Sequence, residues 1–170
     1  MSSYEECIEK EKVSQSPHSP GLVADDEQVS RVLLTPKHVK NGQVLPVAFQ
    51  DIYSSRGFSV LRLGENFDES LEKTIEDLED ENNQYVGYAI AEVSEVRAFY
   101  IPKTTYRLLI VIDTATKVKK AHADIFSTRN TDDIKKLGIK KFIKNLLRYE
   151  FSKLFKYNNR NNSSEESSTP

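Results

Sequence analysis

His122 and Asp124 stand two residues apart in the segment 121–126, whose other members are two alanines, an isoleucine and a phenylalanine. This composition predicts a short β-strand, in which residues two apart point to the same face. His122 and Asp124 would then share the face opposite the core. Their Cα atoms would be about 7 Å apart, so a ligand or a water would have to join them. A histidine that titrates near neutral pH can serve as an acid or a base, which makes the pair a catalytic candidate. The alternative is a half-buried, hydrogen-bonded histidine without a chemical role.

Two arginines lie in the segment that follows Ser54 and Ser55. Arg56 is a candidate catalytic residue and Arg62 a candidate binding residue, because a guanidinium offers a planar fork suited to phosphate or carboxylate. Gly57, beside Arg56, would let a ligand or another backbone approach closely. The alternative is a strand entry with one solvated arginine and one structural ion pair.

The C-terminal part of the chain is rich in basic residues. Eight Lys or Arg residues lie between residues 134 and 156, against one acid, Glu150. On a predicted helix, four of them would form a stripe opposite the apolar residues: Lys140, Lys141, Lys144 and Arg148. Such a stripe is suited to nucleic-acid phosphates, to an acidic protein or to an anionic membrane surface. The alternative is a solvated outer face of the helix.

Charge is sorted along the whole chain. Residues 1–100 carry nine Lys/Arg and nineteen Asp/Glu, a net charge of −10, whereas residues 101–170 carry fifteen and seven, a net charge of +8. The total of −2 hides this division. The asymmetry raises the question of an anionic partner for the second half.

Several classes of function have no motif in this sequence. It holds no phosphate-binding loop, no glycine-rich dinucleotide turn, no paired Cys/His spacing and no Gly-x-Ser-x-Gly elbow. We therefore expect no metal and no cofactor. The one cysteine, Cys7, cannot form an internal disulfide, and the longest apolar run, Leu108–Ile112, is too short to span a bilayer. No signal peptide is recognised, so we expect a cytoplasmic protein without a transmembrane segment.

Composition divides the chain into three parts. Residues 1–28 and 158–170 are polar, without a periodic apolar pattern, and are predicted to be disordered tails. Residues 29–157 have the size of a single domain.

Within that domain, alternating and periodic apolar residues predict strands and helices. Strands are expected at 58–63, 85–91, 106–113 and 121–126, and an acidic helix is expected from Asn66 to about residue 80. Strand 106–113 is apolar on both faces, which favours a central place in the sheet. A long basic helix would close the domain from Thr131 to Phe155. These elements indicate an α+β fold: a single small sheet, mixed or antiparallel, with the acidic helix and the long basic C-terminal helix packed on it.

Several short segments resemble a family of small, uncharacterised bacterial domains. They are Arg31 to Pro36 with Gly42, Ala48-Phe49, Ser59-Val60-Leu61-Arg62 and Ala121-His122-Ala123-Asp124-Ile125 before a closing basic helix. The resemblance covers about residues 30–157. It implies that the arginine segment and the His122 segment belong together, but it implies no established activity.

Two functions from different classes follow as expectations. The first is a non-enzymatic binding or accessory domain of a bacterial cytoplasmic system, which engages an acidic protein or nucleic acid through the basic C-terminal helix. The second is a small transferase or phosphodiester-processing enzyme, with His122 as acid or base and Arg56 or Arg62 holding an anionic substrate. The sequence leaves the oligomeric state open, and it leaves open whether the protein is an enzyme.

Overall fold

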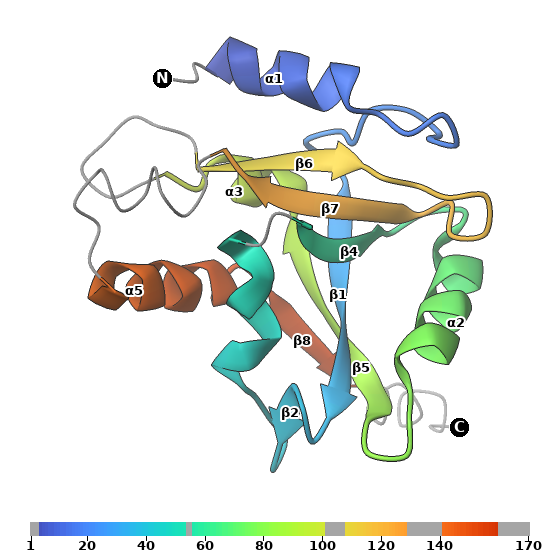
Figure 1. Ribbon diagram of the computed structural model, residues 1–170, viewed down its shortest axis with the longest axis vertical. Helices are drawn as coiled ribbons and strands as arrows, with labels where there is room; N and C mark the ends of the chain where they lie inside the picture. Colours follow the sequence, from blue (N-terminus) through green and yellow to red (C-terminus); the bar gives the residue numbers. More distant parts are fainter. Residues whose placement is uncertain (1–3, 54–55, 101–107, 129–140, 160–170) are drawn as a thin grey trace, which may run out of the picture.

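A computed structural model of the protein describes residues 4–53, 56–100, 108–128 and 141–159 (Figure 1). These residues form a six-stranded sheet in the order β6-β7-β4-β1-β5-β8 and a two-stranded sheet, β2-β3, and all strand pairs are antiparallel. The strands are β1 (Gln28–Thr35), β2 (Val39–Lys40), β3 (Gln43–Val44), β4 (Phe58–Arg62), β5 (Gln84–Glu92), β6 (Leu109–Asp113), β7 (His122–Ser127) and β8 (Lys156–Asn159). The helices are α1 (Tyr4–Val13), the 3-10 segment η1 (Pro46–Tyr53), α2 (Phe67–Leu78), α3 (Val93–Arg97) and α5 (Lys141–Ser152). The α+β class is thus confirmed, and the main sheet is antiparallel.

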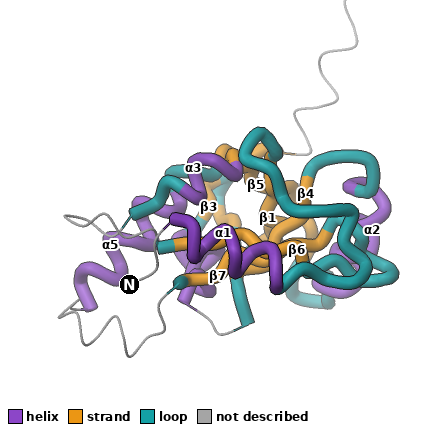
Figure 2. The backbone as a smooth tube through the Cα atoms, turned by 90° about the horizontal axis from the view of Figure 1, so that it is seen from above, coloured by secondary structure: helices purple, strands orange, loops and turns teal. Residues whose placement is uncertain are grey.

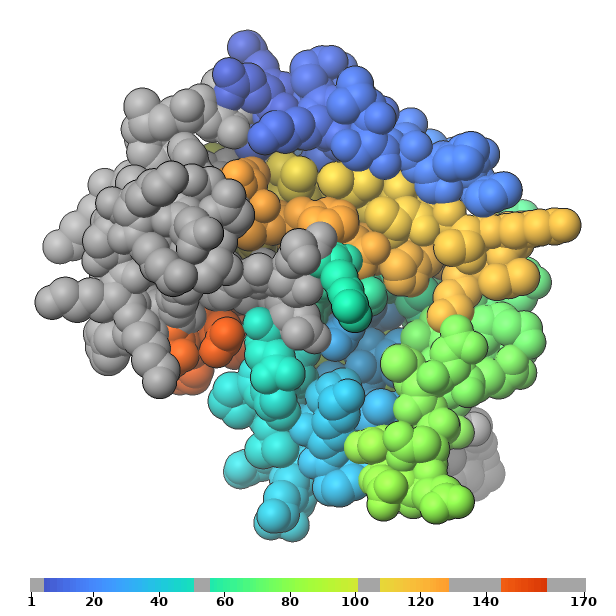
Figure 3. All heavy atoms as spheres, viewed as in Figure 1, coloured from blue at the N-terminus to red at the C-terminus, as the bar shows by residue number. Residues whose placement is uncertain are grey.

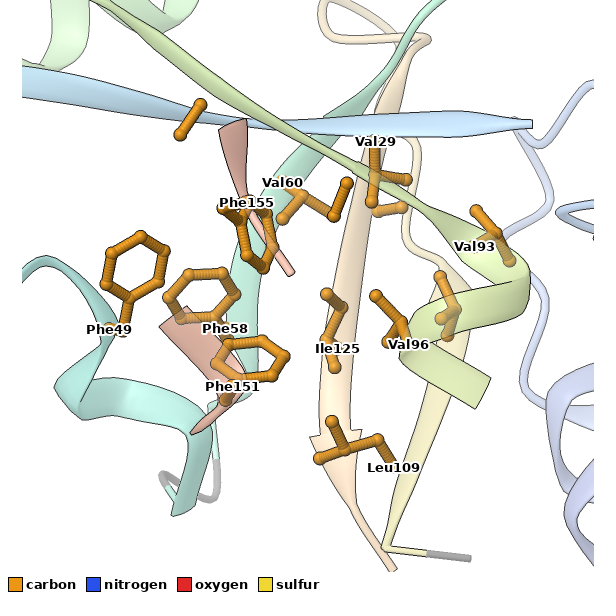
Figure 4. Close-up of a cluster of buried hydrophobic side chains, with 14 of the residues drawn as sticks. Val29, Phe49, Phe58, Val60, Val93, Val96, Leu109, Ile125, Phe151 and Phe155 are labelled. Carbon is orange, nitrogen blue, oxygen red and sulfur yellow. The ribbon is translucent and has the colours of Figure 1, made fainter. Parts of the chain in front are cut away.

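One face of the main sheet carries a core of phenylalanines. Phe58 from β4 and Phe49 from η1 pack against Phe151 from α5 and Phe155, which follows that helix (Figure 4). Their ring centroids lie 5.2–6.2 Å apart, within the usual range for interacting aromatic side chains. Valines 93 and 96 of α3 extend the same core toward β6 and β7.

The pairing of β4 with β7 decides which side chains share a face. Phe58 lies opposite Ile125, and Leu61 lies opposite His122. Ala123 and Ile125 are fully buried in the core, so His122 and Asp124 project from the opposite face. The predicted division of this strand between its two faces is confirmed.

The second face of the sheet is covered by two helices. The acidic helix α2 lies over β1 and β4, and α1 lies across the β6 end of the sheet (Figures 1 and 2). Cys7 of α1 packs on Ile110 and Ile112 of β6, with Phe126 of β7 beside them. The predicted acidic helix is present, although Asn66 makes no side-chain hydrogen bond at its N-terminus.

Helix α1 falls within residues 1–28, where the sequence predicted a disordered tail. The structure differs because one acidic residue of this polar helix is buried. Glu11 is 3% exposed and accepts hydrogen bonds from Arg97 of α3, at 2.6 and 3.3 Å, and from the backbone N–H of Val111, at 3.0 Å. Arg97 also donates to Asp25 at 2.6 Å. Burial opposes the charge on Arg97, but hydrogen bonds to Glu11 and Asp25 outweigh it and raise the pKa of its guanidinium.

The position predicted for the most apolar strand is wrong. β6 is buried along its whole length, yet it lies at one edge of the sheet rather than in its centre. Its second face is apolar because α1 covers it, not because strands flank it on both sides. Residues 106–107 of the predicted strand lie outside the described residues.

The C-terminal elements also differ from the prediction. The predicted C-terminal end of the closing helix is wrong: α5 ends at Ser152, and the polar segment Lys156–Asn159 continues as β8, paired with β5. A long helix is not shown by the described residues. Thr131 and Lys140, at the predicted start of that helix, lie outside the described residues. Among the described helices, none is both long and apolar enough to cross a membrane.

Candidate functional site

A cavity of about 180 Å³ lies between α2 and the sheet face formed by β1, β4 and β7. Figure 3 shows this side of the molecule, where β1 is set back between α2 and the strand β7. The basic residues that line the cavity are Arg31, Lys37, His38, Lys119 and His122. Hydroxyls of Ser30, Ser59 and Thr74 and apolar side chains such as Leu61 complete the lining, which contains no Asp or Glu among the described residues.

The cavity exists because α2 faces the sheet with small polar residues. Ser70 is the buried residue of the helix, and its Oγ accepts the backbone N–H of Ala121 at 3.0 Å. Thr74, one turn later, donates to the carbonyl of Ser70 at 2.7 Å, and Leu78 is 41% exposed. The inner side of the helix therefore does not fill the space above the sheet as a row of leucines would.

A chain of hydrogen bonds runs behind His122. Asp124 is 6% exposed and accepts hydrogen bonds from the hydroxyls of Ser59 at 2.9 Å and Thr114 at 2.7 Å. The same Thr114 hydroxyl lies 2.8 Å from Nδ1 of His122, whereas the direct distance from this nitrogen to Asp124 is 3.8 Å. The predicted link between His122 and Asp124 is therefore supplied by a side chain of the protein rather than by a ligand or a water.

His38, the second histidine of the cavity, is oriented by a backbone hydrogen bond. His38 is 5% exposed, and its Nδ1 accepts the N–H of Leu34 at 3.3 Å. In the neutral ring the proton must then lie on Nε2. Neighbouring Lys37 is exposed at the rim.

Two carboxylates of the acidic helix region act on the lysines of the cavity from outside its lining. Asp77 forms an ion pair with Lys119 at 2.5 Å, and this hydrogen bond lowers the pKa of its carboxyl. The pKa of Asp80 is lowered mainly by hydrogen bonds from Asn82 and Asn83, with a smaller contribution from the charge of Lys37. Both carboxyl groups are solvated, so the Asp77–Lys119 ion pair and the attraction between Asp80 and Lys37 are weak and sensitive to salt.

Arg62 is used by the structure in another place. Leu61 shares a face with His122, so Arg62 projects from the opposite face of the sheet. Its guanidinium pairs with Glu27 through two hydrogen bonds of 2.8 Å and contacts buried Asp113. Burial opposes its charge, but hydrogen bonds to Glu27 and Asp113 outweigh it and raise the pKa of the arginine. This is the structural ion pair that the sequence left as an alternative, with partners outside the acidic helix.

The other predicted residues do not join His122 either. Arg56 is exposed, at the end of the β4–β7 pair where Phe58 lies opposite Ile125. Next to it, Gly57 has a φ of +80° and lies against Phe126 and Asp124, so the close approach expected there is made by β7.

The predicted basic stripe is only partly within the described residues. Lys140 lies outside them, and the side chains of Lys141 and Lys144 are not described. Arg148 is half-buried on α5. The role of this stripe in binding stays a prediction.

Sequence reasoning missed Thr114, which links His122 to Asp124, and the cavity residues Lys37, His38 and Lys119. The last three lie in turns or loops, where no periodic pattern marks a residue that faces a ligand. Thr114 had a usable signal. Asp113 pairs with Ala123, so Thr114 comes next to His122 in the β6–β7 hairpin once its register is known.

No group of three or more His, Cys, Asp or Glu residues that could hold a metal ion occurs in the described part of the chain. Comparisons of the sequence and structure with models of protein families, with curated proteins and with solved structures found no significant match. The functional argument therefore rests on the geometry of the cavity alone.

Proposed function

We propose that this protein binds a small anionic ligand in the cavity beneath α2. The observation that carries the proposal is the lining, in which Lys37, His38, Lys119 and His122 occur with no carboxylate among the described residues. Arg31 is already engaged, since its Nη1 donates to the carbonyl of Ser59 and its guanidinium lies 4.6 Å from the ring centre of Phe58. We expect Lys37, Lys119 and the two histidines to contact an anion, as charges or as N–H donors, with Lys119 also paired with Asp77.

The size and lining of the cavity favour a small ligand. The cavity has a volume of about 180 Å³. This volume lies below the roughly 300–1,000 Å³ typical of sites for drug-sized ligands. Among the described residues, no Phe, Tyr or Trp lines the cavity, so they provide no aromatic platform for stacking a nucleobase there. These features support a small oxyanion rather than a nucleotide or a nucleic-acid strand.

The cavity also separates this proposal from the catalytic hypothesis. Catalysis by His122 with Arg56 or Arg62 required the three side chains in one pocket, and neither arginine is among the cavity residues. Binding by a C-terminal basic surface involves a different part of the molecule and is independent of the cavity.

The test is isothermal titration of the full chain with inorganic phosphate. We expect Lys37→Gln and Lys119→Gln each to weaken binding about tenfold, because each removes a charged donor from the cavity. Lys117→Gln is the matched control, since Lys117 is exposed in the same loop as Lys119 but does not line the cavity. Failure of the unaltered protein to bind either phosphate or sulfate would overturn the proposal. So would equal losses in all three variants.

A further inference from the structure

We infer that His122 makes this cavity selective for oxyanions that carry a proton, such as hydrogen phosphate or a small hydroxy acid, over fully ionised ones. The inference rests on the proposed function, because it concerns the ligand of the same cavity. It arises from the hydrogen bonds behind the ring, which determine the nitrogen of His122 that carries a proton.

Asp124 determines the direction of these hydrogen bonds. Its carboxylate can only accept hydrogen bonds, so the hydroxyls of Ser59 and Thr114 both donate to it. A threonine hydroxyl has one proton, and Thr114 has used it on Asp124. The Thr114 oxygen lies 2.8 Å from Nδ1 of His122, so it must accept a hydrogen bond from a protonated Nδ1. The neutral ring then has its lone pair on Nε2.

The lone pair of Nε2 is the chemical feature that selects the ligand. His122 lines the cavity, and its Nδ1 side is held by Thr114, so Nε2 is the polar atom that it can offer to a ligand. The nitrogen groups of Lys37, His38 and Lys119 donate, whereas a neutral His122 presents a nitrogen lone pair to the ligand. A ligand oxygen that carries a proton can donate to it, whereas a bare anionic oxygen would meet it lone pair to lone pair.

Charged groups surround His122 on several sides. Asp124 lies 3.8 Å from Nδ1 on the same strand, and Lys119, from the loop before β7, lines the same cavity. Lys119 is paired with Asp77 of α2, and the facing strand β4 contributes the uncharged Ser59. Lys37 and His38 lie farther along the cavity, after β1.

Hydrogen phosphate and sulfate provide a direct comparison. At about pH 8 both are tetrahedral dianions of similar size, but only phosphate retains a proton. We expect titration calorimetry of the full chain at that pH to give about tenfold tighter binding of phosphate than of sulfate, as expected when one ligand leaves an acceptor unmatched. His122→Ala should bring this ratio close to one.

Thr114→Val tests the source of the selectivity. Valine has the shape of threonine but cannot accept the proton of Nδ1, so the ring is no longer held in one tautomer and the ratio should fall toward one. Ser16→Ala is the matched control, because it removes a hydroxyl that donates to the carbonyl of Ala115, next to Thr114, from a residue that does not line the cavity. It should leave the ratio unchanged. Circular dichroism checks that each variant is folded.

A measurement on the unaltered protein completes the test without relying on any variant. Long-range ¹H–¹⁵N spectra at about pH 8 should show Nδ1 of His122 protonated and Nε2 unprotonated. A protonated Nε2 would overturn the inference, as would equal binding of the two anions or a ratio that persists in His122→Ala. In each of these cases binding of phosphate would still support the proposed function, whereas binding of neither anion would end both.

Discussion

Thr114 illustrates how one small side chain controls the chemistry of two others. Its hydroxyl lies between His122 and Asp124, at 2.8 and 2.7 Å, and bridges a pair whose direct separation is 3.8 Å. The aspartate therefore acts on the histidine through an oxygen with only one proton to give. Replacement of Thr114 by valine removes both hydrogen bonds and keeps the shape of the side chain.

Gly57 is the residue on which the packing of this group depends. A Cβ added at Gly57 would lie 2.8 Å from the ring of Phe126 and 2.9 Å from Cβ of Asp124. Its φ of +80° is also a value that side chains with a Cβ rarely adopt. We expect Gly57→Ala to lower the free energy of unfolding by about 2 kcal/mol more than Gly42→Ala.

Gly42 is a matched control because its φ is +75° and no atom lies within 4 Å of the added Cβ. Both variants carry the backbone strain, and only one meets neighbouring atoms. Urea denaturation of the two variants measures the difference. Equal losses would mean that Phe126 and Asp124 move aside at no cost.

At this scale the sequence predicted the face of each side chain better than its partners. Alternation along a strand was enough to place His122 and Asp124 together, opposite Ala123 and Ile125. The partners came from residues whose position depends on how distant segments meet: Arg62 pairs with Glu27 and Asp113, which are 35 and 51 residues away. No local pattern encodes such a contact.

Among the elements, α1 shows how a polar helix can be held by very few contacts. Its buried residues are Cys7, on the apolar face of β6, and Glu11, between Arg97 and the backbone of Val111. The rest of its described surface is largely exposed. Most of the specificity of this docking therefore lies in one carboxylate.

Loss of that carboxylate should be costly. Within the described part of the chain, Glu11→Ala leaves the buried Arg97 with Asp25 as its remaining charged partner, and it removes the acceptor of the Val111 N–H. We expect the free energy of unfolding to fall by about 3 kcal/mol, as is typical when one member of a buried ion pair is removed. Chemical denaturation followed by circular dichroism measures it.

Glu9→Ala on the same helix is the control. Glu9 is 65% exposed and pairs only with Lys12, also exposed, so its loss should change stability by about 0.5 kcal/mol or less. A similar small effect of Glu11→Ala would show that α1 contributes little to the folded state.

The elements also show why burial on both faces does not locate a strand. β6 is apolar on both faces, which predicts a central strand if no helix from the N-terminal segment covers the sheet. The covering layer came instead from α1, whose polar composition hid its contact with the sheet. β8 was also hidden by polar composition, since its residues, Lys156 to Asn159, give no apolar pattern. Backbone pairing with β5 nevertheless places them at the edge of the sheet.

Across the whole molecule, the two faces of the sheet differ in what covers them. One face holds a continuous cluster of aromatic rings, in which Phe58 and Phe151 are fully buried. The other carries the cavity beneath α2, whose buried Ser70 hydroxyl accepts the backbone N–H of Ala121 next to β7. Stability should therefore depend mainly on the first face and ligand binding on the second.

This division predicts a large loss of stability for one substitution and a small loss for another. Phe151→Ala should lower the free energy of unfolding by about 4 kcal/mol, as for other large core side chains, with little change in phosphate affinity per folded molecule. Leu78→Ala, at a side chain that is 41% exposed beside the cavity, should cost about 1 kcal/mol or less. Denaturation and calorimetry of both variants test the division, and comparable losses of stability would contradict it.

The general architecture was within reach of the sequence, because periodic apolar residues locate β4, β5, β7 and α2 without any long-range information. The ends of the molecule and the shape of the cavity were not. They depend on contacts between segments far apart in the chain, such as α1 with β6 and α2 with β1.

The position of α1 also bears on how the chain avoids self-association during synthesis. β6 consists of the residues Leu-Ile-Val-Ile-Asp at a sheet edge, a sequence of the kind that pairs with copies of itself when its backbone groups are exposed. Glu11 occupies one of those groups, the N–H of Val111, and Cys7 covers the adjoining side chains. Because α1 precedes β6 by about a hundred residues, the ribosome releases the cover before the strand that needs it.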